Sequence, residues 1–221
     1  MNNAELFIYN NLNFEYEDIY RKNYYLLSDY QHAKLNKYKL LNDKKRSLIG
    51  YLLLHKGLLD LNFSKFPLKS IRYNRYNCPF LAENIGFNIS HSGNYVICII
   101  GKNNIFGIDI EEKLFNIDFP LLLNEICTPL EMEEIINCDD IQEAFFKIWV
   151  AKEATTKAEG QGLNIPLKEI LVSNHTCNYK SNIWHLQYFD ICEQYSSCLV
   201  SFYKINQVNL HYINLVDSIL E

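Results

Sequence analysis

The 221-residue sequence predicts an α+β fold, and three observations lead to this class. Hydrophobic residues make up 48% of the chain and charged residues 21%, which is enough apolar material for a substantial core. Apolar residues recur at helical spacing in two stretches, residues 48–59 and 141–159. Short apolar runs separated by Gly or Asn follow each stretch, as in antiparallel sheets. The length itself fits either one large unit or two small lobes.

The first half begins with a predicted strand at residues 6–9, and a Tyr-rich stretch of helical character follows to residue 39. Asn42 and Asp43 are candidate N-cap residues for the helix that contains residues 48–59. Gly93-Asn94 and the segment 102–104 are turn signals between strand-like runs. Together these runs predict a small antiparallel sheet, and they comprise residues 71–73, 87–89, 95–100 and 105–110.

In the second half, Thr128-Pro129-Leu130-Glu131 has the composition of a helix start, with Thr as N-cap, Pro in the first turn and Glu three residues after the cap. A long amphipathic helix is predicted at residues 141–159 and is ended by Gly160 and Gly162. Strand-like alternation then returns at residues 170–172, 184–188, 198–203 and 210–213. Each half therefore consists of helices followed by strands.

Charge and composition exclude several classes of protein. The chain has 21 Lys and Arg against 26 Asp and Glu, a net charge of −5, so no basic field is expected to attract nucleic acid. No apolar stretch approaches the roughly 18 residues of a membrane span, and the N-terminus lacks the pattern of a signal peptide. Seven cysteines without a C-x-x-C pair are expected to be reduced thiols, and their spacing matches no usual zinc pattern. We therefore expect a soluble cytoplasmic protein.

The segment Gly107-Ile108-Asp109-Ile110-Glu111 places two carboxylates two residues apart on a predicted strand. Side chains alternate between the faces of a strand, so Asp109 and Glu111 project together while Ile108 and Ile110 point into a core. Mg²⁺ prefers one or two protein carboxylates together with waters and substrate phosphates. The segment is either such a metal site or an ordinary solvated strand face.

The second candidate segment, residues 149–160, carries Lys152, Glu153 and Lys157 on the predicted long helix. Glu153 and Lys157 are four residues apart and can form a surface ion pair worth roughly 0.3–0.5 kcal/mol. In the functional interpretation, Glu153 is a further metal ligand or general base, and Lys157 and Lys152 neutralise phosphate charge.

The third candidate segment, Phe87-Asn88-Ile89-Ser90-His91-Ser92-Gly93, runs from a strand into a turn. Its hydroxyls can donate hydrogen bonds to phosphate oxygens, and His91 can donate or titrate near neutral pH. A serine nucleophile is excluded because Ser90 and His91 face opposite sides of a strand and no G-x-S-x-G elbow is present. The alternative is a hydrogen-bonded turn without a further role.

Together, the three segments F-N-I-S-H-S-G, G-I-D-I-E and W-x-x-K-E-A-x-x-K-x-x-G-x-G-L resemble those of the 4′-phosphopantetheinyl transferases. The resemblance is strongest to the type that activates surfactin synthetase, and it extends from residue 6 to residue 167. It implies two similar α+β lobes that imitate a dimer, with the active site and coenzyme A in the cleft between them. The expected lobes are residues 1–103 and residues 104–221.

The resemblance also implies roles for individual residues. Asp109, Glu111 and Glu153 fall on the Mg²⁺-binding acids, with Mn²⁺ as the alternative cation, and Glu153 is also the candidate base. Lys157 falls on the lysine that contacts the transferring phosphate. The residues expected to hold coenzyme A, its 3′-phosphate end included, are Lys34, Arg46, Ser47, Ser90, His91, Lys152 and Lys157.

The implied reaction transfers the phosphopantetheine arm of coenzyme A to a serine of an apo acyl or peptidyl carrier protein and releases adenosine 3′,5′-bisphosphate. One departure from the family is that Tyr76-Asn77-Cys78-Pro79 stands where relatives usually have Tyr-Gly-Lys-Pro, so a cation that would meet coenzyme A is missing unless Arg75 replaces it. The acceptor could belong to fatty acid, polyketide, nonribosomal peptide or lysine-pathway machinery, and a monomer is expected.

Two alternatives to the transferase remain open: a metal-dependent phosphodiesterase or nucleotide hydrolase, and an inactive module that binds coenzyme A or a carrier. For carrier docking, the candidate is an apolar and basic patch within residues 115–134, although its apolar residues could equally belong to the core. These apolar residues are Phe119, Leu121, Leu122, Leu123 and Met132.

Overall fold

The computed structural model describes residues 2–113 and 119–213. Their contacts divide the chain into two compact units. The first unit comprises Met1–Tyr73, Pro79–Asn103 and Ile205–Glu221, and the second comprises Asn74–Cys78 and Asn104–Lys204. The chain passes from one unit to the other after residue 103, and also at residues 74–78 and after residue 204.

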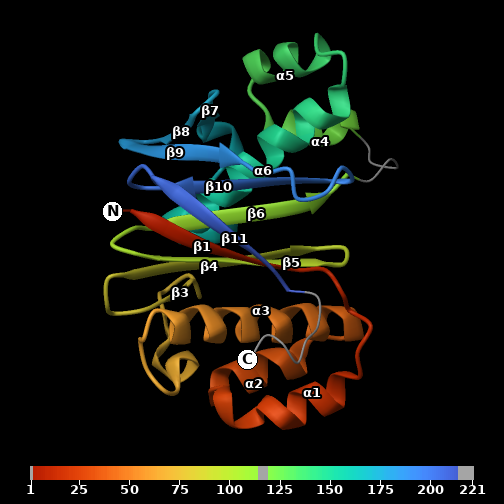
Figure 1. Cartoon of the computed structure of the whole chain (residues 1–221). Coiled ribbons are helices and arrows are strands. Elements are labelled where there is room, and N and C mark those ends of the chain that lie inside the picture. Colours follow the sequence, from red (N-terminus) through yellow and green to blue (C-terminus); the bar gives the residue numbers. More distant parts are fainter. Residues whose placement is uncertain (1, 114–118, 214–221) are drawn as a thin grey trace. The chain divides into compact units, whose positions relative to one another are not determined.

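The first unit is built on a four-stranded sheet with the order β11-β1-β5-β4 (Figure 1). β1 is antiparallel to β5, β5 is antiparallel to β4, and β1 is parallel to β11. The strands of the first unit are β1 (Asn3–Tyr9), β4 (Ile85–Ser92), β5 (Tyr95–Lys102) and β11 (Gln207–Ile213), with a separate pair β2 (Arg72–Tyr73) and β3 (Pro79–Phe80).

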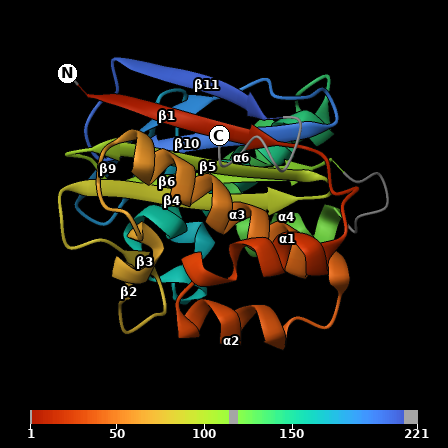
Figure 2. The same cartoon turned by 60° about the horizontal axis from the view of Figure 1, so that its bottom comes forward.

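Helix α3 (Leu41–Asp60) crosses one face of this sheet, and the shorter helices lie against α3 (Figure 2). Its buried leucines pack with residues of β1 and β5 in one hydrophobic core. The shorter helical elements are α1 (Tyr16–Asn23), η1 (Tyr24–Leu26), α2 (Asp29–Lys37) and η2 (Pro67–Ser70). The Tyr-rich stretch is thus helical, as its composition predicts.

The N-cap predicted for α3 is wrong. The helix begins after Leu40, which makes no side-chain cap, and Asn42 and Asp43 lie inside its first turn. The carboxylate of Asp43 instead accepts a hydrogen bond at 2.5 Å from the guanidinium of Arg46, three residues later. A residue type that commonly caps helices can equally accept a hydrogen bond from a nearby cationic side chain. The sequence does not distinguish these two arrangements.

The second unit is built on a five-stranded sheet with the order β6-β10-β9-β8-β7, and α6 packs against β6 and β10 (Figure 1). The described helical elements of this unit are α4 (Phe119–Ile126), α5 (Pro129–Ile136), α6 (Ile141–Glu159), η3 (Gly162–Asn164) and η4 (Leu167–Glu169). The strands are β6 (Phe106–Glu112), β7 (Leu171–Val172), β8 (Thr176–Tyr179), β9 (Asn182–Tyr188) and β10 (Tyr195–Ser201).

Helix boundaries in the second unit confirm the sequence prediction. Thr128 and Glu131 form a reciprocal capping box at the start of α5. Asp140 caps α6 through a hydrogen bond from the backbone N–H of Glu143 at 2.9 Å. Gly160 ends α6 in the left-handed conformation, with φ of 67°. None of the described helices is long and apolar enough to span a membrane.

Strand partners differ from the prediction in two places. The run at 105–110 does not join the sheet of β4 and β5, because β6 pairs with β10 in the second unit. The last strand, expected in the second lobe, instead lies parallel to β1 in the first unit. Alternation identifies a strand and its faces but does not identify its neighbour in the sheet.

Candidate active site

Strand β6 turns its polar face toward α6, and Gly107 fixes how close the two elements come. A Cβ atom on Gly107 would lie 1.8 Å from the carbonyl oxygen of Ala154, so only glycine fits at this position. Because side chains alternate along a strand, Asp109 and Glu111 share the face of Gly107. The sequence G-I-D-I-E thus encodes both a close helix contact and the direction of two carboxylates.

Lys157 of α6 reaches this face of β6. Its ammonium donates hydrogen bonds to Asp109 Oδ1 at 2.6 Å and to the Ile108 carbonyl oxygen at 3.2 Å. The side chain of Asp109 is 3% exposed and that of Lys157 is 27% exposed, so the carboxylate is enclosed while the ammonium keeps access to solvent. The structure therefore brings together two residues that the sequence analysis singled out in separate segments.

Glu153 lies one helical turn before Lys157 and belongs to the same cluster. Burial raises the pKa of its carboxyl, and the negative charge of Asp109 raises it further, while Lys157 acts in the opposite sense. The effect of the Asp109 charge on Glu153 requires their carboxyl groups to be neighbours. Glu111 shares the strand face of Asp109 and is partly exposed. We refer to Asp109, Glu111, Glu153 and Lys157 as the carboxylate site.

The donor set of the carboxylate site fits a hard divalent cation. Two carboxyl groups in a largely buried position disfavour simultaneous ionisation, and the raised pKa of Glu153 expresses this cost. A divalent cation removes the cost, and Mg²⁺ needs only one or two protein carboxylates when phosphate oxygens and waters complete its coordination. Within residues 2–113 and 119–213, no group of three His, Cys, Asp or Glu side chains is already arranged around one metal position.

Lys152 was expected to hold phosphate, and the structure contradicts this expectation. Its side chain is fully buried, and its ammonium donates to the Ile126 carbonyl oxygen at 2.8 Å and to Glu131 Oε2 at 2.7 Å. An enclosed ammonium with two partners is not available to a substrate. Although Lys152 and Lys157 are close in sequence, only Lys157 reaches the carboxylate site.

The residues expected to bind coenzyme A in the first unit gather around the β4–β5 hairpin, with one exception. Arg46 of α3 donates to the carbonyl oxygen of Gly93 at 2.8 Å, which brings it to the turn that follows His91. Ser90 is buried and His91 is partly exposed on β4. Ser47, also on α3, is buried. Lys34 is exposed on α2, and no contact joins it to this group in the described structure.

The turn at residues 74–78 contains a residue that the sequence analysis missed. Asn74 accepts hydrogen bonds from the backbone N–H groups of Tyr76 and Cys78, and its amide donates to the Gly160 carbonyl oxygen at 2.8 Å. One side chain thus shapes the turn and attaches it to the C-terminal end of α6. The available signal in the sequence was Asn74 itself, because Asx side chains commonly form hydrogen bonds with backbone groups two residues later in a turn.

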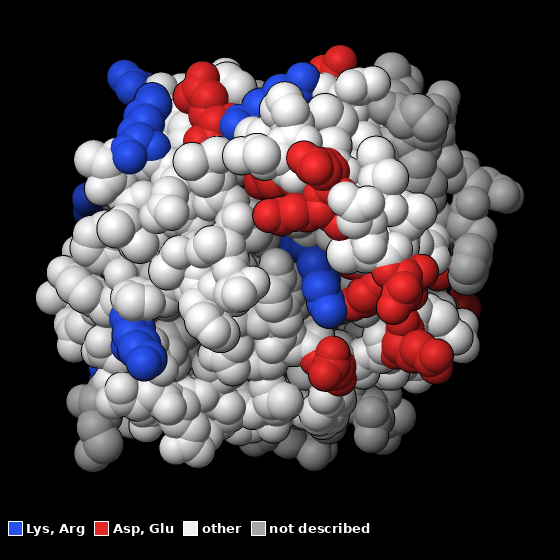
Figure 3. Space-filling view, turned by 90° about the horizontal axis from the view of Figure 1, so that it is seen from above, with Lys and Arg blue, Asp and Glu red and all other residues white. Residues whose placement is uncertain are grey.

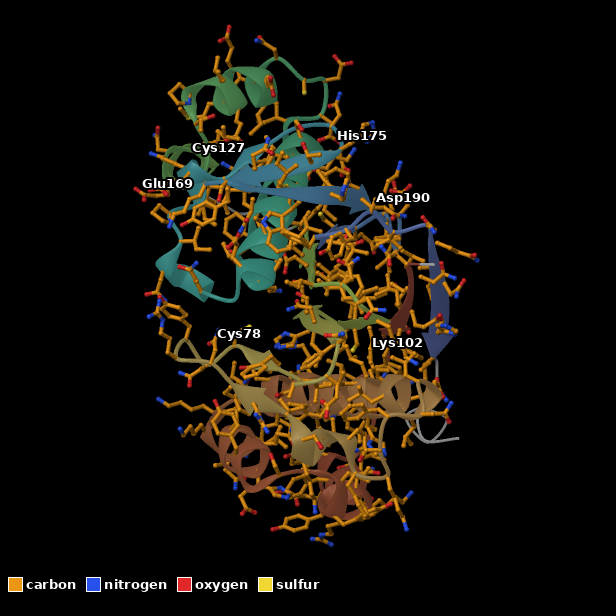
Figure 4. All side chains as sticks on the ribbon, turned by 90° about the vertical axis from the view of Figure 1, so that its left-hand side faces the viewer. Cys78, Lys102, Cys127, Glu169, His175 and Asp190 are labelled. Atoms are coloured by element: carbon orange, nitrogen blue, oxygen red, sulfur yellow. The ribbon has the colours of Figure 1, made fainter. Side chains whose placement is uncertain are left out.

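Cys78 occupies this turn (Figure 4), and burial raises the pKa of its thiol. The neutral thiol supplies no charge where relatives usually have lysine. The guanidinium of Arg75, the expected substitute for that cation, lies over the ring of Tyr76, 4.7 Å from the ring centroid.

The expected docking segment at 115–134 is apolar but not basic. Residues 115–118 lie outside the described part of the chain, as do the side chains of Phe119 and Leu121. Leu123 is buried and Leu122 and Met132 are partly buried, whereas Leu130 is 73% exposed. Acidic side chains are conspicuous at the end of the molecule viewed in Figure 3, and the exposed carboxylates of this region are Glu125, Glu133, Glu134, Asp139 and Asp140.

Comparisons with known proteins agree with the resemblance seen in the sequence. A family model described as the 4′-phosphopantetheinyl transferase superfamily matches residues 105–208, and one described as 4′-phosphopantetheinyl transferase, N-terminal, matches residues 16–103. These two matches leave residues 1–15, 104 and 209–221 unmatched.

Individual relatives carry the same description. The 4′-phosphopantetheinyl transferase gsp of Aneurinibacillus migulanus is 35% identical over 155 residues, which is 66% of this chain and 62% of that relative. The 4′-phosphopantetheinyl transferase Sfp of Bacillus subtilis is 26% identical over 186 residues, 81% of this chain and 78% of the relative. The match to gsp therefore spans less than two thirds of that protein.

Proposed function

Because the chain belongs to the 4′-phosphopantetheinyl transferase superfamily, we propose that it transfers the 4′-phosphopantetheine arm of coenzyme A to a serine hydroxyl of an apo acyl or peptidyl carrier protein. The observation that carries this proposal is the contact between Lys157 and Asp109 beside Glu153. It joins a cation with access to solvent to a pair of carboxyl groups, as a phosphoryl-transfer site requires.

The reaction exchanges one P–O bond for another. The serine oxygen of the carrier forms a bond to the phosphorus that bears the pantetheine arm, and the bond from that phosphorus to the bridging pyrophosphate oxygen breaks. Adenosine 3′,5′-bisphosphate leaves with the bridging oxygen, and the serine proton goes to a base. The chain itself supplies no nucleophile, so its residues bind, orient and neutralise charge.

Glu153 is the proposed proton acceptor. It lies one helical turn before Lys157 on α6 and beside the charge of Asp109, so it belongs to the cluster at which the transfer is proposed. Lys157 supplies a fixed positive charge to the oxygens of the transferring phosphate. This role requires the ammonium to share its contacts between Asp109 and the substrate, which its partial exposure permits.

A divalent cation completes the proposed site. Mg²⁺, or Mn²⁺ as the alternative, would be held by Asp109, Glu153 and Glu111, and it would neutralise negative charge on the pyrophosphate. The buried carboxylate of Asp109 forms an ion pair with Lys157. The protein thus retains a carboxylate oriented toward α6 whether or not a cation is present.

We propose that coenzyme A binds with its phosphates near Ser90 and His91 and with its 3′-phosphate end near Lys34, Arg46 and Ser47. Arg46 supports this assignment because its hydrogen bond to Gly93 joins the helix that carries Ser47 to the hairpin that carries His91. We also propose that the protein acts as a monomer in the cytoplasm.

The carrier would dock through the apolar surface of α5. Leu130 and Ile136 are 73% and 60% exposed, more than most leucine or isoleucine side chains of a folded domain. The acceptor pathway, whether fatty acid, polyketide or nonribosomal peptide synthesis, is a question for assay. Neither the hydrolase nor the inactive binding module has support, because the matched families and relatives are described as transferases.

The test is the intact mass of an apo carrier protein after incubation with this chain, coenzyme A and Mg²⁺. We expect a gain equal to one phosphopantetheine arm, and no gain when EDTA replaces Mg²⁺. Asp109→Asn serves as the control for contaminating activity. If several carriers of each class show no gain although coenzyme A binds, the transferase proposal is wrong.

A further inference from the structure

The three serines of β10 differ in the hydrogen bonds that their hydroxyls make. Ser197 donates to the carbonyl oxygen of Phe189 at 2.8 Å, and Ser201 donates to that of Tyr203 at 2.9 Å. Ser196 is 5% exposed, and its hydroxyl oxygen has no hydrogen-bond partner among the described residues. Buried hydroxyls in folded proteins are nearly always bonded, so an exception needs an explanation.

The register of β10 against β6 places Ser196 on the face of the carboxylate site. Ser196 lies directly opposite Glu111, and Cys198 lies opposite Asp109. Residues directly opposite in an antiparallel pair project from the same face, with Cβ atoms about 4.5–5.5 Å apart. The core supports this direction, because Cys198 and Val200, two and four residues after Ser196, pack against buried residues of α6.

We propose that Ser196 is a positioning residue of the carboxylate site, and that its hydroxyl donates a hydrogen bond to the carboxylate of Glu111 when a divalent cation is bound. The inference rests on the proposed function, because Glu111 matters here only as a metal ligand. Hydrogen bonds from neighbouring side chains orient ligating carboxylates and commonly change metal affinity about tenfold or more. The role explains why a hydroxyl is kept in this buried position.

The adjacent serine provides a matched control. Ser197 opposes Ile110 on the other face of the sheet, and its hydroxyl already has a partner. Ser196→Ala and Ser197→Ala remove the same atom from neighbouring positions, so any general effect on β10 should be common to both variants. An effect on cation binding that acts through Glu111 should appear in the Ser196→Ala variant alone.

The readout is Mn²⁺ binding to the full chain, measured by the loss of the free Mn²⁺ signal in electron paramagnetic resonance. We expect Ser196→Ala to weaken Mn²⁺ binding about tenfold and Ser197→Ala to leave it unchanged. Ser196→Thr keeps a hydroxyl and suits a strand, so it should recover most of the affinity. In thermal unfolding, Ser197→Ala should lower the midpoint more than Ser196→Ala does, because only Ser197→Ala loses a hydrogen bond.

Two further variants separate this inference from the proposed function. Asp109→Asn and Glu153→Gln should abolish Mn²⁺ binding if the carboxylate site holds the cation. If they abolish it while Ser196→Ala binds Mn²⁺ as the wild type does, the role of Ser196 is wrong and the site stands. If Asp109→Asn and Glu153→Gln both retain wild-type Mn²⁺ binding, the proposed site itself is wrong.

Discussion

Lys152 Nζ lies 2.7 Å from Glu131 Oε2, and the two side chains are 0% and 7% exposed. The same ammonium donates to the carbonyl oxygen of Ile126, at the end of α4. Glu131 also accepts hydrogen bonds from the backbone N–H groups of Thr128 and Val172. One buried ion pair therefore connects α6 with the end of α4, the start of α5 and strand β7.

Removing the cation of this pair should destabilise the fold strongly. Lys152→Met leaves a buried carboxylate uncompensated, and such changes typically cost about 3–5 kcal/mol in the free energy of unfolding. The double variant with Glu131→Gln should recover part of the loss, because no lone charge remains. Urea unfolding of the full chain measures both.

Lys157→Met is the matched comparison on the same helix. Its side chain is 27% exposed, so water can solvate part of the site that it leaves, and its loss should destabilise less than that of Lys152. Equal stability of the Lys152→Met variant and the wild type would contradict the structural role of the buried pair.

Glu153→Gln should slow transfer while keeping the fold. Loss of a positioned base lowers rates by about 10²–10⁴-fold, and the change also removes a proposed metal ligand, so a loss of at least this size is expected, while glutamine preserves the shape of the side chain. The initial rate of carrier modification, followed by intact mass at saturating coenzyme A and one fixed Mg²⁺ concentration for both proteins, measures the effect. Removing a carboxyl that burial and Asp109 disfavour should not lower thermal stability.

Glu159→Gln is the control for this prediction. Glu159 lies on the same helix, and its Oε1 accepts hydrogen bonds from Asn182 at 2.9 Å and from the Trp184 indole at 2.8 Å. Its variant should lose stability and keep the transfer rate of the folded fraction. A Glu153→Gln enzyme within twofold of wild type would remove Glu153 from the mechanism.

His91→Ala should weaken coenzyme A binding more than it lowers the maximal rate. The proposed contact of His91 is with phosphates of the substrate, so it acts in binding rather than at the attacking serine. A lost hydrogen bond to a charged group corresponds to roughly a tenfold or larger change in dissociation constant, which isothermal titration measures. His175→Ala, at an exposed position of the second unit, should bind as the wild type does.

The sequence predicts local structure well where one segment contains the whole signal. The bounds of α6 and the capping box at Thr128 follow from residues within each element. The prediction is wrong where the outcome depends on distant partners. Nothing in residues 210–213 indicates that β11 pairs with β1, because an alternating strand fits the edge of either sheet.

The same distinction applies to the site. Asp109 and Lys157 were identified as candidates from their motifs, and the structure places Lys157 Nζ 2.6 Å from Asp109 Oδ1. Lys152 was misassigned because its partner, Glu131, is 21 residues away and only the fold encloses both. Ser196 was missed because its significance depends on its register opposite Glu111, which a sequence does not state.

Stability of the chain should fall as the pH drops below the ordinary pKa of histidine. His55 is 4% exposed on α3, and burial lowers its pKa below the ordinary value of 6.5. The unfolded chain therefore binds a proton near pH 6.5 that the folded chain takes up only at lower pH, so this contribution is complete above pH 6.5 and declines below it.

His55→Leu should flatten that decline. One proton per molecule changes the free energy of unfolding by at most about 1.4 kcal/mol per pH unit, which limits the change in slope between pH 7 and 5. Urea unfolding at several pH values measures the slope. Part of the decline should remain, because burial also lowers the pKa of His32. An unchanged slope would show that His55 does not contribute.

Cys78→Lys should tighten coenzyme A binding with little effect on the maximal rate. The turn that carries Cys78 is attached to the end of α6 by Asn74, so its position does not depend on the residue at 78. A lysine there would restore the cation that relatives usually have and add a charge-assisted contact, worth about tenfold in the dissociation constant.

Cys78→Met separates charge from packing in this experiment, because it lengthens the side chain without charging it. A gain from charge should appear only with lysine and should shrink at about 1 M salt, where the Debye length is roughly 3 Å. An equal gain with methionine would mean that better packing beside Gly160, not the missing cation, limits coenzyme A binding. The neutral thiol would then be unrelated to affinity for the phosphates.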